Sequence, residues 1–279
     1  MQPLPHIPGY ELLTRLGGGP MTEVFAARGD GDRPCAVKTL RADWDDEATA
    51  VKLLQREARA GLCVRHPRLV RLLDAHVTRA PWFLVLELLP GESLRRRLRR
   101  DYRLPTAEAV RVARQAAEAV AALHRDGFVH GDVKPDNLQL HGDGDVTLLD
   151  LGFAHRIGEN AAFLRDGYVL GTPSYLAPEL CAPEPAEELR SDLFSLGVTL
   201  FELLTGRLPY PPGSASQTVR RHCDAPPDDV REHAPEVPAA LAALVARLLE
   251  PRPEDRPRAA AAVGQLIRLE IAALRRRSA

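Results

Sequence analysis

Short apolar runs, separated by glycine and other turn residues, mark the first ninety positions of the chain. Three of them predict strands joined by tight turns into antiparallel hairpins, at residues 10–13, 22–27 and 35–40. Apolar residues then recur every three or four positions, which predicts an amphipathic helix over residues 46–63. Two later runs, at residues 69–73 and 82–88, predict two more strands. This part should form a small antiparallel sheet with one main helix.

The pattern changes after Pro90 and Gly91, because longer stretches with helical periodicity replace the short runs. The predicted helices cover residues 106–124, 191–205, 241–249 and 259–274. The second of these is apolar at nearly every position, so we expect it to be buried all round. The sequence therefore predicts an α+β fold of two lobes: a strand-rich N-terminal lobe over residues 1–89 and a larger helical C-terminal lobe over residues 90–279.

A basic run from Arg95 to Arg100 follows the predicted boundary between the lobes. Its simplest interpretation is the solvated face of a helix, with Leu94 and Leu98 turned inward. A docking surface for an acidic partner is the alternative.

Composition and charge narrow the classes of function. The 279 residues include 37 Lys and Arg against 38 Asp and Glu, which gives a formal net charge of -1. No nucleic-acid partner and no anionic membrane surface is expected from that balance. Aromatic residues make up 5% of the chain, too few for a platform that stacks single-stranded bases. The heavy use of Ala, Arg and Pro suggests a GC-rich, bacterial genome.

The four cysteines, Cys35, Cys63, Cys181 and Cys223, form no CxxC pair. They are read as free thiols of a reducing cytosol, so the protein is expected to be cytoplasmic. The first residues lack the basic region and the apolar region of a signal peptide, so none is expected. No stretch approaches the roughly 18 apolar residues of a membrane span.

The triplet His-Gly-Asp occurs twice, at residues 130–132 and 141–143. The second lies between two strand-like segments, residues 138–140 and 146–149, and continues into Gly144. Glycines that adopt positive φ and aspartates that bond nearby backbone explain this second triplet as a hairpin turn.

The first triplet is followed at fixed offsets by Lys134, Asn137 and Asp150. This order resembles the motifs H-R-D-x-K-x-x-N and D-F-G of the eukaryotic-type serine/threonine protein kinases, with Gly131 for Arg and Leu151 for Phe. Further motifs that resemble the family follow its order: Leu16–Val24 as the glycine-rich loop, Lys38 as the strand lysine, Glu57 as its helix partner, Gly171–Glu179 as the activation-segment ending, Ser191–Gly197 as the central helix and Arg256 as the late arginine. The resemblance covers about residues 10–269 and implies the two-lobed protein-kinase-like fold.

The resemblance implies transfer of the γ-phosphate of ATP, with Mg²⁺ or Mn²⁺, to Ser and Thr hydroxyls of proteins. Asp132 would accept the proton of the attacking hydroxyl, Lys134 would steady the γ-phosphate, and Thr172 accompanies Ser/Thr acceptors. Asn137 and Asp150 offer the hard oxygens that suit Mg²⁺. The expected nucleotide-binding residues are Leu16, Gly17, Gly19, Val24, Ala36, Lys38, Glu57, Glu87, Leu89 and Leu140. As scaffold, the resemblance implies an ion pair between Glu179 and Arg256, and an Asp192 that braces the catalytic loop through backbone bonds.

The chain departs from the family pattern in two places. Thr22 replaces the third glycine of the nucleotide loop and Pro20 stiffens its tip, which should weaken nucleotide binding but removes no catalytic group. Gly131 stands where many relatives have an arginine that pairs with a phosphorylated activation segment. Residues 153–170 contain no Ser or Thr, and Tyr168 is their only hydroxyl. We therefore expect activity without activation-loop phosphorylation.

Two alternatives stay open. A small-molecule kinase of the aminoglycoside or choline type shares the fold and the His-Gly-Asp triplet but lacks segments like residues 171–179 and 191–197. A pseudokinase would bind without turnover, and it is disfavoured by the presence of all four residues whose loss would favour it: Lys38, Asp132, Asn137 and Asp150. The expected partners are protein substrates with Ser/Thr acceptors, and the resemblance alone suggests a homodimer through the small lobe.

Overall fold

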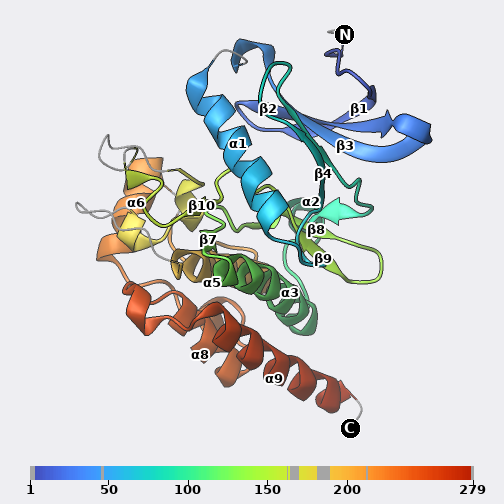
Figure 1. Ribbon diagram of the computed structural model, residues 1–279. Helices are drawn as coiled ribbons and strands as arrows, with labels where there is room; N and C mark the ends of the chain where they lie inside the picture. Colours follow the sequence, from blue (N-terminus) through green and yellow to red (C-terminus); the bar gives the residue numbers. More distant parts are fainter. Residues whose placement is uncertain are drawn as a thin grey trace. The chain divides into compact units, whose positions relative to one another are not determined.

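The computed structural model describes residues 4–44, 47–161, 163, 170–180, 189–211 and 213–277. The chain divides into two compact units. The first comprises Met1–His66, Val70–Pro90 and Asp150–Gly152, and the second comprises Pro67–Leu69, Gly91–Leu149 and Phe153–Ala279. The fold is α+β: an antiparallel sheet dominates the first unit and helices dominate the second (Figure 1).

The first unit is built on a five-stranded antiparallel sheet in the order β1-β2-β3-β5-β4. Its strands are β1 (Glu11–Gly18), β2 (Thr22–Gly29), β3 (Arg33–Leu40), β4 (Leu72–His76) and β5 (Phe83–Leu86). The strand predicted at residues 69–73 is wrong in position, since β4 begins at Leu72. Leu69 instead makes a bridge with Leu148 in the second unit, so a partner distant in sequence decides where the strand starts.

The helix α1 (Ala48–Cys63) lies across one face of this sheet (Figure 1). Leu54 and Ala58 of α1 pack with Leu40 and Leu84 of the sheet, as the three- and four-residue spacing predicted. A second cluster includes Val37 and other residues of the opposite pleat. Both faces of the sheet are therefore apolar, because strand residues alternate between them.

The second unit contains two small sheets and the helices from α2 onward. Its strands are β6 (Glu92–Ser93), β7 (Phe128–Val129), β8 (Leu138–Leu140), β9 (Val146–Leu148) and β10 (His155–Arg156). Its helices are α2 (Leu94–Asp101), α3 (Thr106–Arg125), α5 (Ser191–Thr205), α6 (Ala215–Asp224), α7 (Val230–His233), α8 (Ala239–Leu248) and α9 (Ala259–Arg277). Every residue of α5 is buried, and the helix ends at Gly206, whose φ of 72° is the left-handed C-cap that glycine adopts cheaply.

The hairpin predicted for the second His-Gly-Asp triplet is confirmed. The backbone N–H of His141 donates to the Asp145 carbonyl at 2.8 Å, and the Asp143 carboxylate accepts from the Asp145 N–H at 2.9 Å. Gly144 has a φ of 84°. The triplet turns β8 into β9 and contributes to no other described cluster.

The cysteines Cys35, Cys63 and Cys223 are free thiols, and Cys181 lies outside the described residues. Within the described part of the chain, no helix is both long and apolar enough to span a lipid bilayer.

Candidate active site

A buried cluster of charges links β3 and α1 to the start of residues 150–152 in the first unit. The ammonium of Lys38 donates to Glu57 Oε2 at 2.7 Å and to Asp150 Oδ1 at 2.6 Å. Asp150 has a φ of 59°, a left-handed conformation that Asp tolerates better than most residues, and its Oδ1 also accepts from the Gly152 N–H at 3.1 Å. The predicted pair of Lys38 and Glu57 is confirmed, and Asp150 is a third member that the sequence did not reveal.

Burial works against both charges of the Lys38–Glu57 pair. It raises the pKa of Glu57 to about 7, although the neighbouring Lys38 pulls in the opposite direction. Burial also works to lower the pKa of Lys38, but the charges of Asp150 and Glu57 outweigh it and the pKa is raised. Lys38 therefore stays a cation at neutral pH, and the burial of Glu57 favours its neutral form.

The predicted nucleotide-binding residues of the first two hairpins share a face of the sheet. Val24 lies opposite Lys38 in the β2–β3 register, and Ala36 is two residues before Lys38 on β3. Directly opposed residues and residues two apart point to the same side, so these three line one surface. The chain reverses between β1 and β2 through a turn in which the Gly19 N–H donates to the Thr22 carbonyl at 2.9 Å.

Gly17 and the exposed Leu16 belong to the end of β1. After β5, the N–H of Glu87 donates to the Arg71 carbonyl at 3.0 Å, and the Glu87 carboxylate accepts from the Arg71 N–H at 2.7 Å. The carboxylate of Glu87 therefore has a hydrogen-bond partner within the first unit. The side chain of Leu89 is half-buried. Leu140 is a buried residue of β8 in the second unit.

The carboxylate of Asp132 is held on both oxygens by residues of the second unit. Oδ1 accepts from the Thr172 backbone N–H at 3.1 Å. Oδ2 accepts from Asn137 Nδ2 at 3.0 Å and lies 2.6 Å from the Lys134 ammonium. Lys134 also donates to Thr172 Oγ1 at 2.5 Å. The predicted residues Asp132, Lys134 and Asn137 of this loop thus meet Thr172 of the activation segment, and Asp132 is 3% exposed, so the carboxylate has a single defined orientation.

The loop that carries Asp132 is supported from α5. The buried carboxylate of Asp192 accepts from the N–H groups of His130 at 2.8 Å and Gly131 at 2.9 Å, and from His124 Nε2 at 2.9 Å. Burial works to raise the pKa of Asp192, but the hydrogen bond from His124 and the charge of that ring lower it. The predicted bracing role of Asp192 is confirmed at the level of its contacts.

The predicted ion pair of Glu179 and Arg256 is also confirmed. Arg256 Nη1 and Nη2 donate to the two carboxylate oxygens of Glu179 at 2.8 and 2.7 Å, which is the bidentate geometry that Arg favours. Arg256 is 2% exposed and also donates to the backbone carbonyls of Glu250 and Pro251. The pair therefore fixes residue 179 against the segment that follows α8.

Asn137 and Asp150 are the two residues predicted to hold a divalent cation. Asn137 Nδ2 donates hydrogen bonds to Asp132, so the amide oxygen is the Asn137 atom that could bind a cation. Asp150 contributes a carboxylate whose side chain is 43% exposed. Both are hard oxygen ligands of the kind that Mg²⁺ binds together with phosphate oxygens and water, so each residue fits the ion.

Sequence reasoning missed one buried network. Arg95 of α2 donates to Glu202 Oε1 at 2.5 Å, to the Tyr175 hydroxyl at 2.6 Å and to Asp136 Oδ2 at 3.0 Å. The Tyr175 hydroxyl donates to Glu202 Oε2 at 2.5 Å, and burial followed by the Glu202 charge raises the pKa of Tyr175. Arg95 is therefore not part of a solvated face, whereas Leu94 and Leu98 are buried as predicted.

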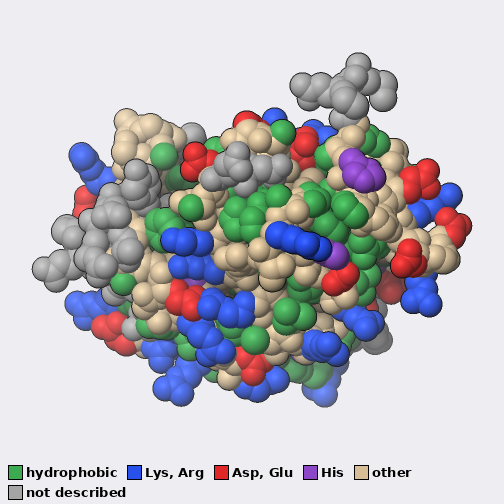
Figure 2. Space-filling view, turned by 45° about the horizontal axis from the view of Figure 1, so that its top comes forward, with side chains coloured by type: hydrophobic (Ala, Val, Ile, Leu, Met, Phe, Trp, Pro, Cys, Tyr) green, Lys and Arg blue, Asp and Glu red, His purple; other side chains and the backbone are tan. Residues whose placement is uncertain are grey.

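Three of the other arginines of α2, Arg96, Arg97 and Arg100, lie beside acidic residues. Arg100 contacts Glu92 at 2.9 Å, and Arg97 pairs with Asp101. On the face drawn in Figure 2, acidic side chains likewise lie among the Lys and Arg side chains. This mixing agrees with the formal net charge of -1 and gives no support to a nucleic-acid surface.

Comparisons with known proteins agree with this arrangement of residues. The family model described as "Protein kinase domain" matches residues 10–266. The chain is 32% identical over 263 residues to the serine/threonine-protein kinase PknB of Mycobacterium leprae (strain TN), which covers 92% of this chain and 42% of that protein. It is 30% identical over 237 residues to the serine/threonine-protein kinase PrkC of Bacillus subtilis (strain 168), with 85% and 36% covered. A third relative, PkaA of Streptomyces coelicolor, is 34% identical over 265 residues, with 90% and 48% covered. The chain thus spans less than half the length of these relatives.

Proposed function

Because the chain belongs to the protein kinase family, we propose that it transfers the γ-phosphate of Mg-ATP to Ser and Thr hydroxyls of protein substrates. The observation that carries this proposal is the clamped carboxylate of Asp132. Its two oxygens are oriented by Thr172, Asn137 and Lys134, and it lies on a loop that Asp192 braces. The relatives named above are serine/threonine-protein kinases, which supports the same reaction.

In the proposed reaction, the acceptor oxygen attacks the γ-phosphorus, the bond to the β,γ-bridging oxygen breaks, and ADP leaves. Asp132 takes the proton of the attacking hydroxyl, and Lys134, 2.6 Å from that carboxylate, stabilises charge on the transferring group. Lys38 would bind the α- and β-phosphates, and the glycines of the β1–β2 turn allow backbone N–H groups to approach them. Bound Mg²⁺, held by Asn137 and Asp150, would neutralise phosphate charge.

For the adenine we propose the backbone of Glu87 and Leu89, with Val24, Ala36, Leu140 and Leu16 as apolar contacts. The N–H of Glu87 is already donated to Arg71, so the carbonyl is the group that Glu87 can offer to the base. The side chain of Ala36 is small and buried on the same face as Lys38, which leaves room for a flat ring. Glu57 holds Lys38 and does not contact the nucleotide itself.

We further propose that activity does not require a phosphorylated activation segment. Gly131 has a φ of 81°, and a Cβ at this position would lie 3.0 Å from the Phe153 carbonyl. The chain here is thus shaped for glycine, and no arginine receives a phosphate at this point. Tyr168 lies outside the described residues. Phosphatase-treated protein should keep its activity, whereas a phosphate at Tyr168 or Thr172 whose removal abolishes activity would contradict the proposal.

The two His-Gly-Asp triplets provide a matched test of the proposed chemistry. Transfer of labelled γ-phosphate from Mg-ATP to a generic basic protein is measured for the unaltered chain, for Asp132→Asn and for Asp143→Asn. Asp132→Asn should lower the rate by roughly 100-fold or more, because it removes the base. Asp143→Asn should leave it unchanged, because Asp143 serves only the β8–β9 turn.

The outcomes separate the alternatives. Equal losses in both variants would show that Asp132 has no special role. Nucleotide binding without any transfer by the unaltered chain would indicate a pseudokinase. Transfer to small metabolites but not to proteins would indicate a small-molecule kinase. A homodimer through the first unit stays a prediction, to be tested by the mass of the protein in solution.

A further inference from the structure

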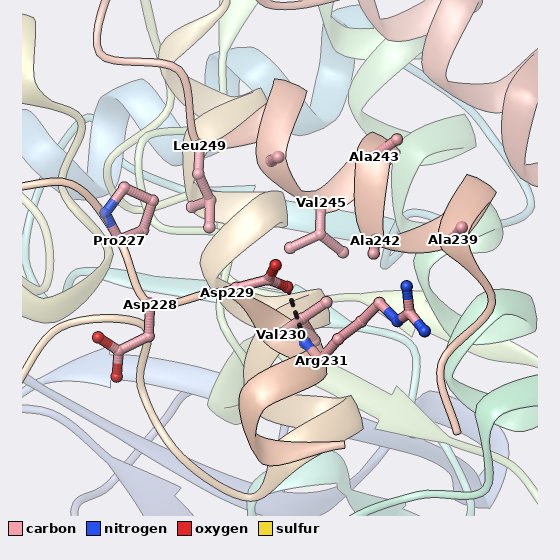
Figure 3. Close-up of a pocket in the computed structure, with 11 residues that line it drawn as sticks. Pro227, Asp228, Asp229, Val230, Arg231, Ala239, Ala242, Ala243, Val245 and Leu249 are labelled. Atoms are coloured by element: carbon pink, nitrogen blue, oxygen red, sulfur yellow. Dashed lines mark hydrogen bonds between the residues drawn. The ribbon is translucent and has the colours of Figure 1, made fainter. Parts of the chain in front are cut away.

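The second unit contains a cavity of about 340 Å³ between α7 and α8 (Figure 3). Its acidic groups are engaged within their own loop, since Asp229 accepts from the Arg231 N–H at 2.9 Å and Asp228 lies 3.0 Å from His233 Nε2. Figure 3 shows alanines of α8 along the opposite wall. With its carboxylates partnered and alanines facing them, this cavity does not indicate which ligand would occupy it.

The helix α9, by contrast, exposes a line of apolar side chains. It lies along the outside of the second unit, next to α3 and α8 (Figure 1). Its inner face is covered, since Ala262 and Leu266 are fully buried. On the other face, Ile267, Ile271 and Leu274 are 40%, 45% and 51% exposed. Their spacings of four and three residues place these side chains in one line along the helix.

Small residues continue this line toward the start of α9. Ala260 is exposed, and a Cβ added at Gly264 would meet only the tip of one side chain, at 3.8 Å. Ala260, Gly264, Ile267, Ile271 and Leu274 alternate steps of four and three, as the contact positions of a coiled coil do. We call these five residues the α9 seam. It is about 21 Å long at 1.5 Å per residue, so a second helix could lie along it.

The charges beside the α9 seam have one sign. Arg268 and Arg275 are exposed, and neither guanidinium pairs with a carboxylate of the described residues. Glu270 is the only acidic residue of α9, and Arg114 of α3 donates to it at 2.6 Å, on the other flank of the seam. The exposed flank therefore carries cations without a counter-charge, and it favours a partner that brings acidic groups.

A second copy of this chain does not meet that requirement. In an antiparallel pair, the coiled-coil position that holds Arg268 and Arg275 faces itself, so arginine would meet arginine. In a parallel pair, the residue facing Arg275 would be Glu270, whose carboxylate is already held by Arg114. The acidic groups must therefore come from a different protein.

We propose that the α9 seam is a docking surface for an amphipathic helix of a partner protein, with apolar side chains along the seam and acidic side chains opposite Arg268 and Arg275. The seam contains none of the candidate active-site residues, so this inference goes beyond the proposed function and does not depend on it. Ile267, Ile271 and Leu274 supply the apolar surface that binding would bury, and the two arginines select the charge of the partner.

The test uses two synthetic helical peptides of about three heptads, with leucine at the contact positions. One carries glutamate and the other lysine at the positions that flank the contact, so that each repels its own copies. Fluorescence anisotropy of the labelled peptides measures binding to the unaltered chain. The glutamate peptide should bind, and the lysine peptide should bind about 3- to 10-fold more weakly or not at all, which is the range of two exposed ion pairs.

Two matched variants test the apolar part of the surface. Ile271→Asp should weaken binding of the glutamate peptide by about 10- to 100-fold, the range expected for burying one such side chain. Leu62→Asp makes the equivalent change at an exposed apolar position of α1 and should leave binding unchanged. Both variants should keep the phosphoryl-transfer rate of the unaltered chain, which reports an intact fold. The double variant Arg268→Glu, Arg275→Glu should reverse the preference and bind the lysine peptide more tightly.

The remaining outcomes overturn the proposal. No binding of either peptide, or equal binding of both, would refute it with the unaltered chain alone, whether or not Ile271→Asp folds. If Ile271→Asp lowers the mass found by sedimentation of the chain by itself, a second copy occupies the seam. If the unaltered chain binds vesicles of phosphatidylcholine and phosphatidylglycerol and Ile271→Asp does not, a membrane occupies it.

Discussion

Replacing Arg95 by alanine should destabilise the second unit far more than the same replacement at its neighbour Arg96. Both residues lie in α2 and gain the same small helix propensity on becoming alanine. Arg95 is 22% exposed and donates to Glu202, Tyr175 and Asp136. Arg96 is 80% exposed, and its guanidinium lies 3.6 Å from the carboxylate of Glu92.

The magnitude follows from what each change leaves behind. Arg95→Ala leaves Glu202, whose side chain is 10% exposed, as a buried carboxylate without its cation. Breaking a buried pair in this way costs about 3–5 kcal/mol, and the partial exposure of Arg95 reduces the expected loss to about 2–4 kcal/mol. Arg96→Ala removes a surface pair and should cost less than about 0.5 kcal/mol.

Urea unfolding followed by far-UV circular dichroism measures this difference, since helices of the second unit dominate the signal. With a slope of about 2–3 kcal/mol per M, Arg95→Ala should lower the midpoint by about 1 M, and Arg96→Ala should leave it almost unchanged. Adding Glu202→Gln should destabilise the unaltered chain but partly restore the Arg95→Ala variant, because it removes the uncompensated charge. Equal midpoints for the two arginine variants, or no such reversal of sign, would refute the reasoning.

Three further changes have expected outcomes. Burial raises the pKa of Glu57 from 4.5 to about 7 in the folded protein, so Glu57 contributes to the free energy of unfolding below pH 4.5, and this contribution is lost as the pH rises through 7. Glu57→Gln should therefore flatten the pH dependence of the free energy of unfolding, measured by Trp fluorescence. Gly206→Ala should cost about 1–3 kcal/mol, because φ is 72° and the new Cβ would lie 2.7 Å from a backbone oxygen, whereas Gly142→Ala, with nothing within 4 Å, should be nearly neutral in the same melts. Asp192→Ala leaves two backbone N–H groups without an acceptor, which should cost about 2–5 kcal/mol in urea titrations and lower phosphoryl transfer.

Local signals predicted the elements whose ends are set locally. The helix over residues 191–205 was predicted at its observed bounds, because a largely apolar pattern ends at a glycine that takes the left-handed C-cap. The helix α6 was missed, although Ser214 and Gln217 form a capping box that the sequence displays. The strand β4 was misplaced because Leu69 pairs with Leu148, and no local pattern contains that information.

The residues of the candidate site could be predicted where they belong to a motif, whereas contacts between residues far apart in the sequence could not. The resemblance to the kinase motifs pointed to Lys134, Asn137 and Thr172 together with Asp132, and the contacts show that the four meet. Nothing in those offsets says that Asp150 shares the ammonium of Lys38 with Glu57. That contact depends on the conformation of residues 150–152, where a positive φ turns the carboxylate toward β3.

The acidic residues inside the apolar stretch of α5 follow one rule: each is buried together with a hydrogen-bonding partner. Glu202 and Asp192 both lie in α5, where every residue is buried, so each requires a partner before the helix can pack. The sequence states the requirement but cannot choose the cation for Glu202 among 37 Lys and Arg residues. The structure supplies Arg95 for the first and His124 with two backbone N–H groups for the second. His222 meets the same requirement at Nδ1 only. Among the described residues, Nε2 of this ring has no hydrogen-bond partner, so His222 is an exception to the rule that the two acids follow.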